Sequence, residues 1–145
     1  MSLNPSLPEA LQEAYLSAAA GLPSKLPDDT LELAIVSVSS VYDATSSMSI
    51  VVPTIVEAAR GKGIIISNVI GSTAGGVLGS LSGSPLEVEG APCVSVTLAS
   101  LPSVSLNAFH VAEGDVPDQG YDYTDEEWRK YLGDVMMMGD EKVGK

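Results

Sequence analysis

The chain is poor in the residues that build disulfides and in the cysteine and histidine ligands of metal centres. It contains one Cys, one His, one Phe and one Trp among 145 residues. A single Cys excludes an internal disulfide framework and a zinc site made of several cysteines, and a single His leaves little for imidazole ligands. The scarcity of large aromatics predicts a core of Val, Ile, Leu and Ala. We expect no metal ion and no cofactor.

Positive charge is also scarce. Seven Lys and Arg stand against nineteen Asp and Glu, which gives a net charge of -12. Such a chain lacks the clustered cations that neutralise phosphates, so we expect neither a nucleic-acid partner nor docking on an anionic membrane. Just over half of the acidic residues lie from Glu113 onward, so the charge belongs mostly to the C-terminal third. Hydrophobic residues make up 45% of the chain, too many for a disordered acidic tail.

Long apolar runs and targeting signals are missing as well. The first eight residues have no basic region followed by an apolar run, which argues against a secretory signal. The longest apolar candidate, residues 64–81, is interrupted by Asn68 and several glycines, so no membrane insertion is expected. We expect a soluble protein of the cytoplasm, or of an organelle interior such as the plastid stroma if a transit peptide has been removed.

The spacing of apolar residues predicts an α/β (α+β) fold with helices packed on a mixed central β-sheet. Near-helical spacing predicts a helix over residues 8–20, followed by a proline-containing linker. Residues 1–30 are therefore expected to be an N-terminal helix and linker, and residues 31–145 a single domain. Residues 31–39 form a nearly continuous apolar run, which predicts a strand buried on both faces.

A parallel crossover is expected next. Residues 47–60 carry one broad apolar stripe, which predicts a helix that starts later or kinks at Pro53. Residues 64–70 predict a second buried strand. Strand, helix and strand with a short connection form a unit in which the two strands lie parallel.

Short strands separated by Gly, Pro and Ser turns are predicted after this unit, and they are expected to pair antiparallel. They cover residues 77–80, 86–90, 93–98 and 104–111. A capped helix over residues 125–132 and a last strand over residues 135–138 complete the expected order.

The ordered series of these segments resembles the N-terminal domain of the FIST family (F-box and intracellular signal transduction). It begins with Val38-Ser-Ser-Val-Tyr-Asp and continues with Val69-Ile-Gly-Ser-Thr-Ala-Gly-Gly-Val-Leu-Gly. Ala91-Pro-Cys-Val-Ser-Val-Thr-Leu-Ala-Ser-Leu-Pro, residues 104–111 with Phe109-His110, and Trp128 with Leu132-Gly extend the match. The resemblance covers roughly residues 31–138.

The resemblance implies a domain that senses small ligands, amino acids among them, and that is usually followed by a second domain. This sequence stops at Lys145, has no F-box-like segment, and lacks the Asp-Pro that commonly follows the last strand in the family. The expectation is therefore half of the usual pair, which could serve as an interaction subunit instead of a sensor.

The glycine-rich segment that begins at Gly71 is the most informative candidate site. Backbone N–H groups freed by glycines could approach an anion or a carboxylate ligand, although the segment matches neither a Walker loop nor a dinucleotide fingerprint. The alternative is a tight turn with close strand packing that only Gly permits. Ligands of open α/β sheets bind at the carboxyl ends of parallel strands. The predicted ligand-binding residues are Ser39, Ser40, Tyr42, Asp43, Gly71, Ser72, Thr73, Gly75 and Gly76.

Other candidate residues have simpler explanations. Cys93 and His110 could form a nucleophile pair, but a buried core thiol and a half-exposed strand histidine are favoured. The acids between Asp115 and Glu127 lack the spacing of a calcium loop and are expected to form a solvated face. Aromatics mixed with these charges are typical of contact surfaces, although Trp128 and Tyr131 could instead clamp a helix to the sheet. The predicted partner-binding residues are Tyr121, Tyr123, Trp128 and Tyr131.

Three hypotheses about function follow from the sequence. The leading one is a non-enzymatic domain that binds a small molecule, such as an amino acid, or a protein partner. The alternative is an accessory or assembly subunit of a larger complex, for example an organellar one, that keeps the fold without ligand sensing. The third is an enzyme that uses Cys93 or a Ser as its nucleophile.

Overall fold

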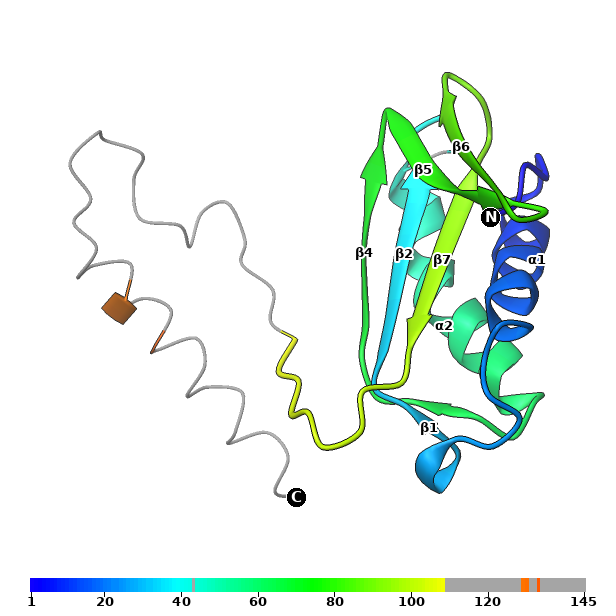
Figure 1. Cartoon of the computed structure of the whole chain (residues 1–145). Helices are drawn as coiled ribbons and strands as arrows, with labels where there is room; N and C mark the ends of the chain where they lie inside the picture. Colours follow the sequence, from blue (N-terminus) through cyan, green and yellow to red (C-terminus); the bar gives the residue numbers. More distant parts are fainter. Residues whose placement is uncertain (43, 109–128, 131–132, 134–145) are drawn as a thin grey trace. The chain divides into compact units, whose positions relative to one another are not determined.

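The computed structural model describes residues 1–42, 44–108, 129–130 and 133, and the side chains of residues 44–48 are outside this description. All of the helices and strands named below lie in one compact unit, Met1–Val104. Its order is α1 Leu7–Ala19, the 3-10 turn η1 Pro27–Asp29, β1 Thr30–Leu31, β2 Leu33–Ser39, α2 Ala44–Arg60, β3 Ile65–Ile66, β4 Val69–Ala74, β5 Gly76–Leu81, β6 Ser84–Glu89 and β7 Val94–Ala99. The fold is α+β with mixed sheets, as the sequence predicts (Figure 1).

The main sheet has three strands in the order β4-β2-β7. Strand β2 pairs parallel with β4, in the register Ala34↔Val69 to Ser39↔Ala74, and antiparallel with β7. The parallel pair confirms the crossover predicted through α2. A small parallel pair, β1 with β3, and an antiparallel hairpin, β5 with β6, stand beside it.

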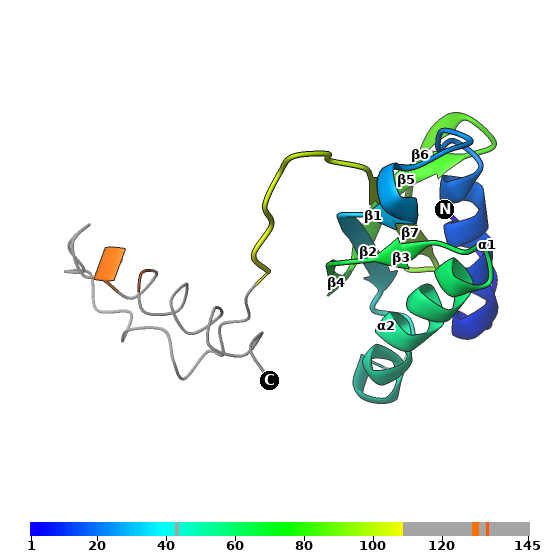
Figure 2. The same ribbon diagram turned by 90° about the horizontal axis from the view of Figure 1, so that it is seen from below.

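Both long helices pack on the same face of the main sheet (Figure 2). Alternate residues of β2 point to this face because side chains of a strand alternate between its two sides. Ala34, Val36 and Val38 are buried there against Leu11 and Ile55 of the two helices. The core is aliphatic, with Tyr15 as its largest fully buried side chain.

The N-terminal residues are fastened to the sheet before α1 begins. Ser2 and Val94 exchange two backbone hydrogen bonds, of 2.8 and 2.9 Å. The Glu13 carboxylate accepts hydrogen bonds from Ser2 Oγ at 2.5 Å and from Asn4 Nδ2 at 2.9 Å, and these bonds lower its pKa. Residues 1–6 therefore belong to the folded unit together with α1.

Several predicted segments differ in the structure. Residues 31–39 and 64–70 are each divided, because Glu32 and the turn at Asn68 separate short strands from β2 and β4. Helix α2 begins at Ala44 and contains Pro53. The prediction that β2 is buried on both faces is wrong, because Ile35 is 39% exposed. The predicted strand over residues 104–111 is absent over residues 104–108, and the rest of it lies outside the described residues.

Gly71 is required where β4 approaches β2. A Cβ built at Gly71 would lie 2.3 Å from the backbone oxygen of Val36, whereas a Cβ at Gly75 would meet nothing within 4 Å. Overpacking of this kind costs about 1–3 kcal/mol. We expect Gly71→Ala to lower the free energy of unfolding by that amount and Gly75→Ala to change it by less than about 0.5 kcal/mol. Urea unfolding of the two variants and the wild type checks this, and equal stabilities for the two variants would contradict it.

Candidate functional site

Strands β2 and β4 are parallel neighbours, so their carboxyl ends lie side by side at the same end of the main sheet. Ser39 pairs with Ala74, and the Ser40 N–H donates a hydrogen bond of 2.9 Å to the Ala74 oxygen. The structure therefore brings Ser39 and Ser40 next to the start of the Gly75-Gly76 turn (Figure 1). Such an edge is where open α/β sheets place ligands. Asp43, predicted to join this site, lies outside the described residues.

Two of the predicted ligand residues use their polar atoms to hold the turn after β2. Ser39 is only 1% exposed, and its Oγ accepts a hydrogen bond from the Val41 N–H at 3.3 Å. The Tyr42 hydroxyl donates a hydrogen bond of 2.5 Å to the backbone oxygen of Asn4. Burial, followed by the nearby charges of Cys93 and Glu13, raises the pKa of Tyr42. Ser40 is exposed, as is Val41 beside it.

The glycine segment divides into a packed part and an open part. Gly71 lies within β4 and is explained by its close approach to Val36. Ser72 and Thr73 are exposed on the same strand. Gly75 faces open space, and a Cβ at Gly76 would lie 3.2 Å from the Glu89 side chain. Close packing thus accounts for the first glycine, while the Gly75 backbone can be approached from solvent.

Cys93 lacks the surroundings of a reactive thiol. It is fully buried between Met1 and Val77 in a small cluster under the β5–β6 hairpin. Burial raises the pKa of its thiol, and the amino group of Met1 opposes this only in part. Reactive cysteines are partly exposed and have lowered pKa values, so this thiol stays protonated at neutral pH. His110, its proposed partner, lies outside the described residues.

The predicted contact surface of the C-terminal third also lies outside the described residues. This holds for Tyr121, Tyr123, Trp128 and Tyr131, and for the acids between Asp115 and Glu127. Of the predicted helix over residues 125–132, only Arg129 and Lys130 are described. Within the described part of the chain, no group of three or more His, Cys, Asp or Glu could hold a metal ion.

The sequence prediction missed an exposed face on the main sheet. Ile35 and Ile70 pair in register on the side opposite the helices and are 39% and 43% exposed. Residues paired with one another share a face, so their neighbours on that side follow from the register. We call the following set the open sheet face: Leu33, Ile35, Ser37, Ile70, Ser72, Thr97 and Ala99. The alternation in Val36-Ser37-Val38-Ser39 was a signal of one-sided burial.

The β5–β6 hairpin covers the remainder of this side of the sheet. It crosses the main sheet near the end of β2 and the start of β7 (Figure 1). A Cβ at Gly79 would lie 2.8 Å from Ser95 Oγ, which shows how closely the hairpin sits on β7. The hairpin therefore limits the open sheet face to the region around Ile35 and Ile70.

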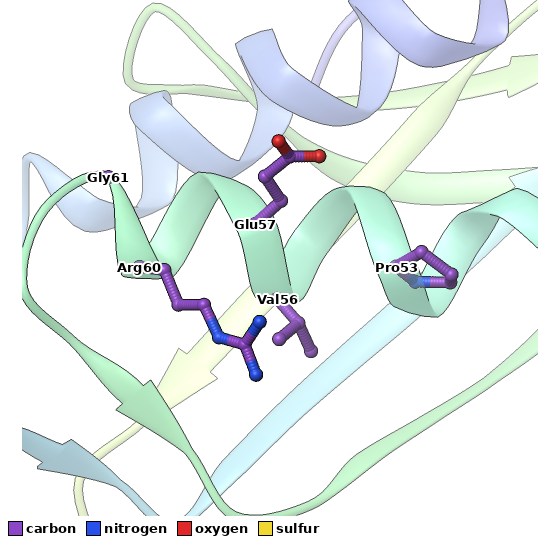
Figure 3. A pocket seen from close by; sticks show the side chains of 5 residues that line it. All are labelled: Pro53, Val56, Glu57, Arg60 and Gly61. Atoms are coloured by element: carbon purple, nitrogen blue, oxygen red, sulfur yellow. The ribbon is translucent and has the colours of Figure 1, made fainter.

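A shallow hollow with a volume of about 620 Å³ lies on α2. Its lining residues, Pro53, Val56, Glu57, Arg60 and Gly61, recur at helical spacing on one exposed stripe (Figure 3). Glu57 and Arg60 project to different sides of this stripe (Figure 3). Without converging polar groups, the hollow has no arrangement that would fix a small ligand.

Comparisons with known proteins leave the family open. No family model matches the chain, and neither a curated protein nor a solved structure matches it. The resemblance to the FIST family therefore stays a prediction. None of the helices in the described residues has the length and apolar character needed to cross a membrane.

Buried Cys93 should make the protein less stable at alkaline pH. The unfolded chain releases the thiol proton near pH ~8.5, whereas the folded chain retains it because its pKa is raised. Stability is therefore full below that pH and is lost as pH rises toward the folded pKa. Urea midpoints measured at about pH 7 and about pH 9.5 should fall less in Cys93→Ala than in the wild type. Equal falls would contradict this assignment.

Proposed function

We propose that this protein is a non-enzymatic binding domain that contacts a protein partner through its open sheet face. One observation carries the proposal: Ile35 and Ile70 pair in register on the exposed side of the main sheet. This role agrees with the accessory or assembly subunit expected from the sequence.

The argument rests on how a sheet is buried. Two helices cover one side of the main sheet and the hairpin covers part of the other. The aliphatic side chains left in water would stabilise a complex by roughly 25 cal/mol for each Å² of apolar surface buried. Contiguous exposed apolar surface with a polar rim marks interaction sites in soluble proteins.

The polar neighbours of the two isoleucines suit this role. Ser37, Ser72 and Thr97 place hydroxyl groups beside them on the same face. Strand β4 is also an edge strand, with Gly71 and Thr73 turning their backbone groups outward. An apolar centre with hydroxyls around it and an open strand edge can both bury and hydrogen-bond a partner.

Replacing the two isoleucines tests the proposal. In native extract, the wild type should elute in an assembly larger than the single chain. The double variant Ile35→Thr and Ile70→Thr should elute as the free chain, because the apolar centre is lost. Val52→Thr is the matched control, since Val52 is 47% exposed on α2, which packs on the opposite side of the main sheet. Size-exclusion chromatography, with the chain detected in each fraction by mass spectrometry, measures the assembly size of the wild type, the double variant and the control. A wild type that elutes alone, or a double variant that stays assembled, would overturn the proposal.

A small ligand at the edge formed by β2 and β4 is the second candidate. It is favoured by the exposed Ser40 and the open backbone at Gly75, which the Ser40–Ala74 hydrogen bond brings together. An amino acid could place its carboxylate on the Gly75 N–H and the Ser40 hydroxyl group.

A panel of amino acids tests this candidate by thermal shift. A ligand at about 100 times its Kd stabilises by about 2.7 kcal/mol, which raises Tm by roughly 5–10 °C for a chain of this size. The rise should shrink in Ser40→Ala and persist in Gln12→Ala, whose side chain is exposed on α1. If no amino acid raises Tm, the hypothesis that this protein senses amino acids is wrong.

A further inference from the structure

The outer edge of β7 is only partly used. Ser39 N–H donates to the Cys93 oxygen, and the register places the backbone groups of residues 93, 95, 97 and 99 toward β2. The backbone N–H and C=O groups of Val94, Val96 and Leu98 therefore point away from β2, toward the outer edge of β7. Val94 exchanges its two bonds with Ser2, and within the described residues Ser2 is the only residue that pairs with this edge. Val96 and Leu98 continue the same ladder.

A groove follows this free part of the edge. Its volume is about 390 Å³, and it runs between α1 and the turn of the β5–β6 hairpin. Ser17 and Ala18 of α1 form one side, Ser80 and Ser82 of the hairpin form another, and Val96 and Thr97 form the floor. Helix α1 lies beside β7 along this length, and the hairpin approaches from the other face of the sheet (Figures 1 and 2). Met1 closes the end where Ser2 already pairs.

We propose that this groove binds an extended peptide segment of a partner protein, which adds to β7 as an antiparallel strand in line with Ser2. Strand addition of this kind takes its affinity from backbone hydrogen bonds and its selectivity from alternate side chains. The bridge between Ser2 and Val94 shows that this edge accepts an antiparallel strand at this place in the fold. The volume falls within the range of about 300–1,000 Å³ typical of ligand sites.

The alternation of side chains defines the partner's chemistry. A residue opposite Val96 or Leu98 would point to the helix side, as those two side chains do, and would meet Ala18. Only a small apolar side chain fits there. A residue opposite Thr97 would point to the hairpin side, where Ser80 and Ser82 offer hydroxyl groups. The preferred segment is therefore uncharged and alternates small apolar residues with hydroxyl residues.

This peptide site is independent of the function proposed above. It lies along the outer edge of β7, whereas the open sheet face is centred on β2 and β4 at the other end of the strand order. Substitution of Ile35 and Ile70 leaves it intact, so the two proposals can fail separately.

The probe is the capped peptide acetyl-Thr-Val-Thr-Val-amide, titrated into the full chain by calorimetry. It ends opposite Val96 because Met1 already lies opposite Ser95, and its second Thr is the middle Thr between the two Val. The wild type should bind it, and Ser17→Trp should weaken binding by about tenfold or more, because the exposed Ser17 side chain lines the groove and an indole there would fill it. Gln12→Trp is the matched control, because it adds the same indole at an exposed position of α1 outside the groove and should leave Kd unchanged.

N-methylated peptides distinguish strand addition from other modes of binding. Methylation of the two Val nitrogens should abolish binding, because these N–H groups would donate to the oxygens of Val96 and Leu98. Methylation of the middle Thr nitrogen should be tolerated, because that N–H faces away from β7. Amide hydrogen exchange should slow at Val96 and Leu98 when the unmethylated peptide is added.

Three results would overturn the proposal. One is the absence of binding by the probe. Another is equal binding by the Ser17→Trp and Gln12→Trp variants. The third is protection of the Val96 and Leu98 amides from exchange before any peptide is added, which would mean that a segment of the same chain or a second copy already covers the edge.

Discussion

Strand β2 is the constraint on which the rest of the structure depends. Among the described strands of the main sheet, it is the only one with a neighbour on each side, parallel β4 and antiparallel β7. Its side chains at Ala34, Val36 and Val38 anchor both helices, and its last residues bond to Ala74 and Cys93. The candidate ligand edge, the open sheet face and the free edge of β7 are all positioned by its two ladders.

A three-stranded sheet has little capacity to hide both of its faces. Helices α1 and α2 cover one side of the sheet, and the β5–β6 hairpin covers part of the other. Within the described residues, Ile35 and Ile70 remain exposed, and the outer edge of β4 and part of the outer edge of β7 have no paired strand. We therefore expect binding to be distributed over surfaces of the sheet, not concentrated in one deep cavity.

Local sequence was sufficient for the elements whose residues agree with one another. Helix α2 follows from its apolar stripe, and exposure of Pro53 lets the helix run through it. The parallel relation of β2 and β4 follows from a short crossover, which has few other solutions. The close packing at Gly71 could also be foreseen, but its place inside a strand and its partner Val36 could not, because register depends on the whole ladder.

The features that were missed depend on partners distant in sequence. The apolar run from Leu33 to Val36 looks the same whether the second face is covered or open, and only the alternation from Val36 to Ser39 indicates an open face. The pairing of Ser2 with Val94 and the bond from Tyr42 to Asn4 join segments with no local signal. The predicted strand over residues 104–111 has β propensity, but residues 104–108 find no neighbour within the described sheets. Propensity without a partner does not make a strand.

The pairing of the first residues with β7 also governs the order of folding. Ser2 cannot find Val94, and α1 cannot complete its packing on β7, until that last strand has left the ribosome. Both helices and the first crossover emerge earlier, before β7 can complete the face of the sheet on which the helices pack. Closure between such distant segments raises the contact order and slows folding. The hydrophobic core of the nascent chain thus stays incomplete until residues 94–99 have emerged, a period in which chaperones would have the most to bind.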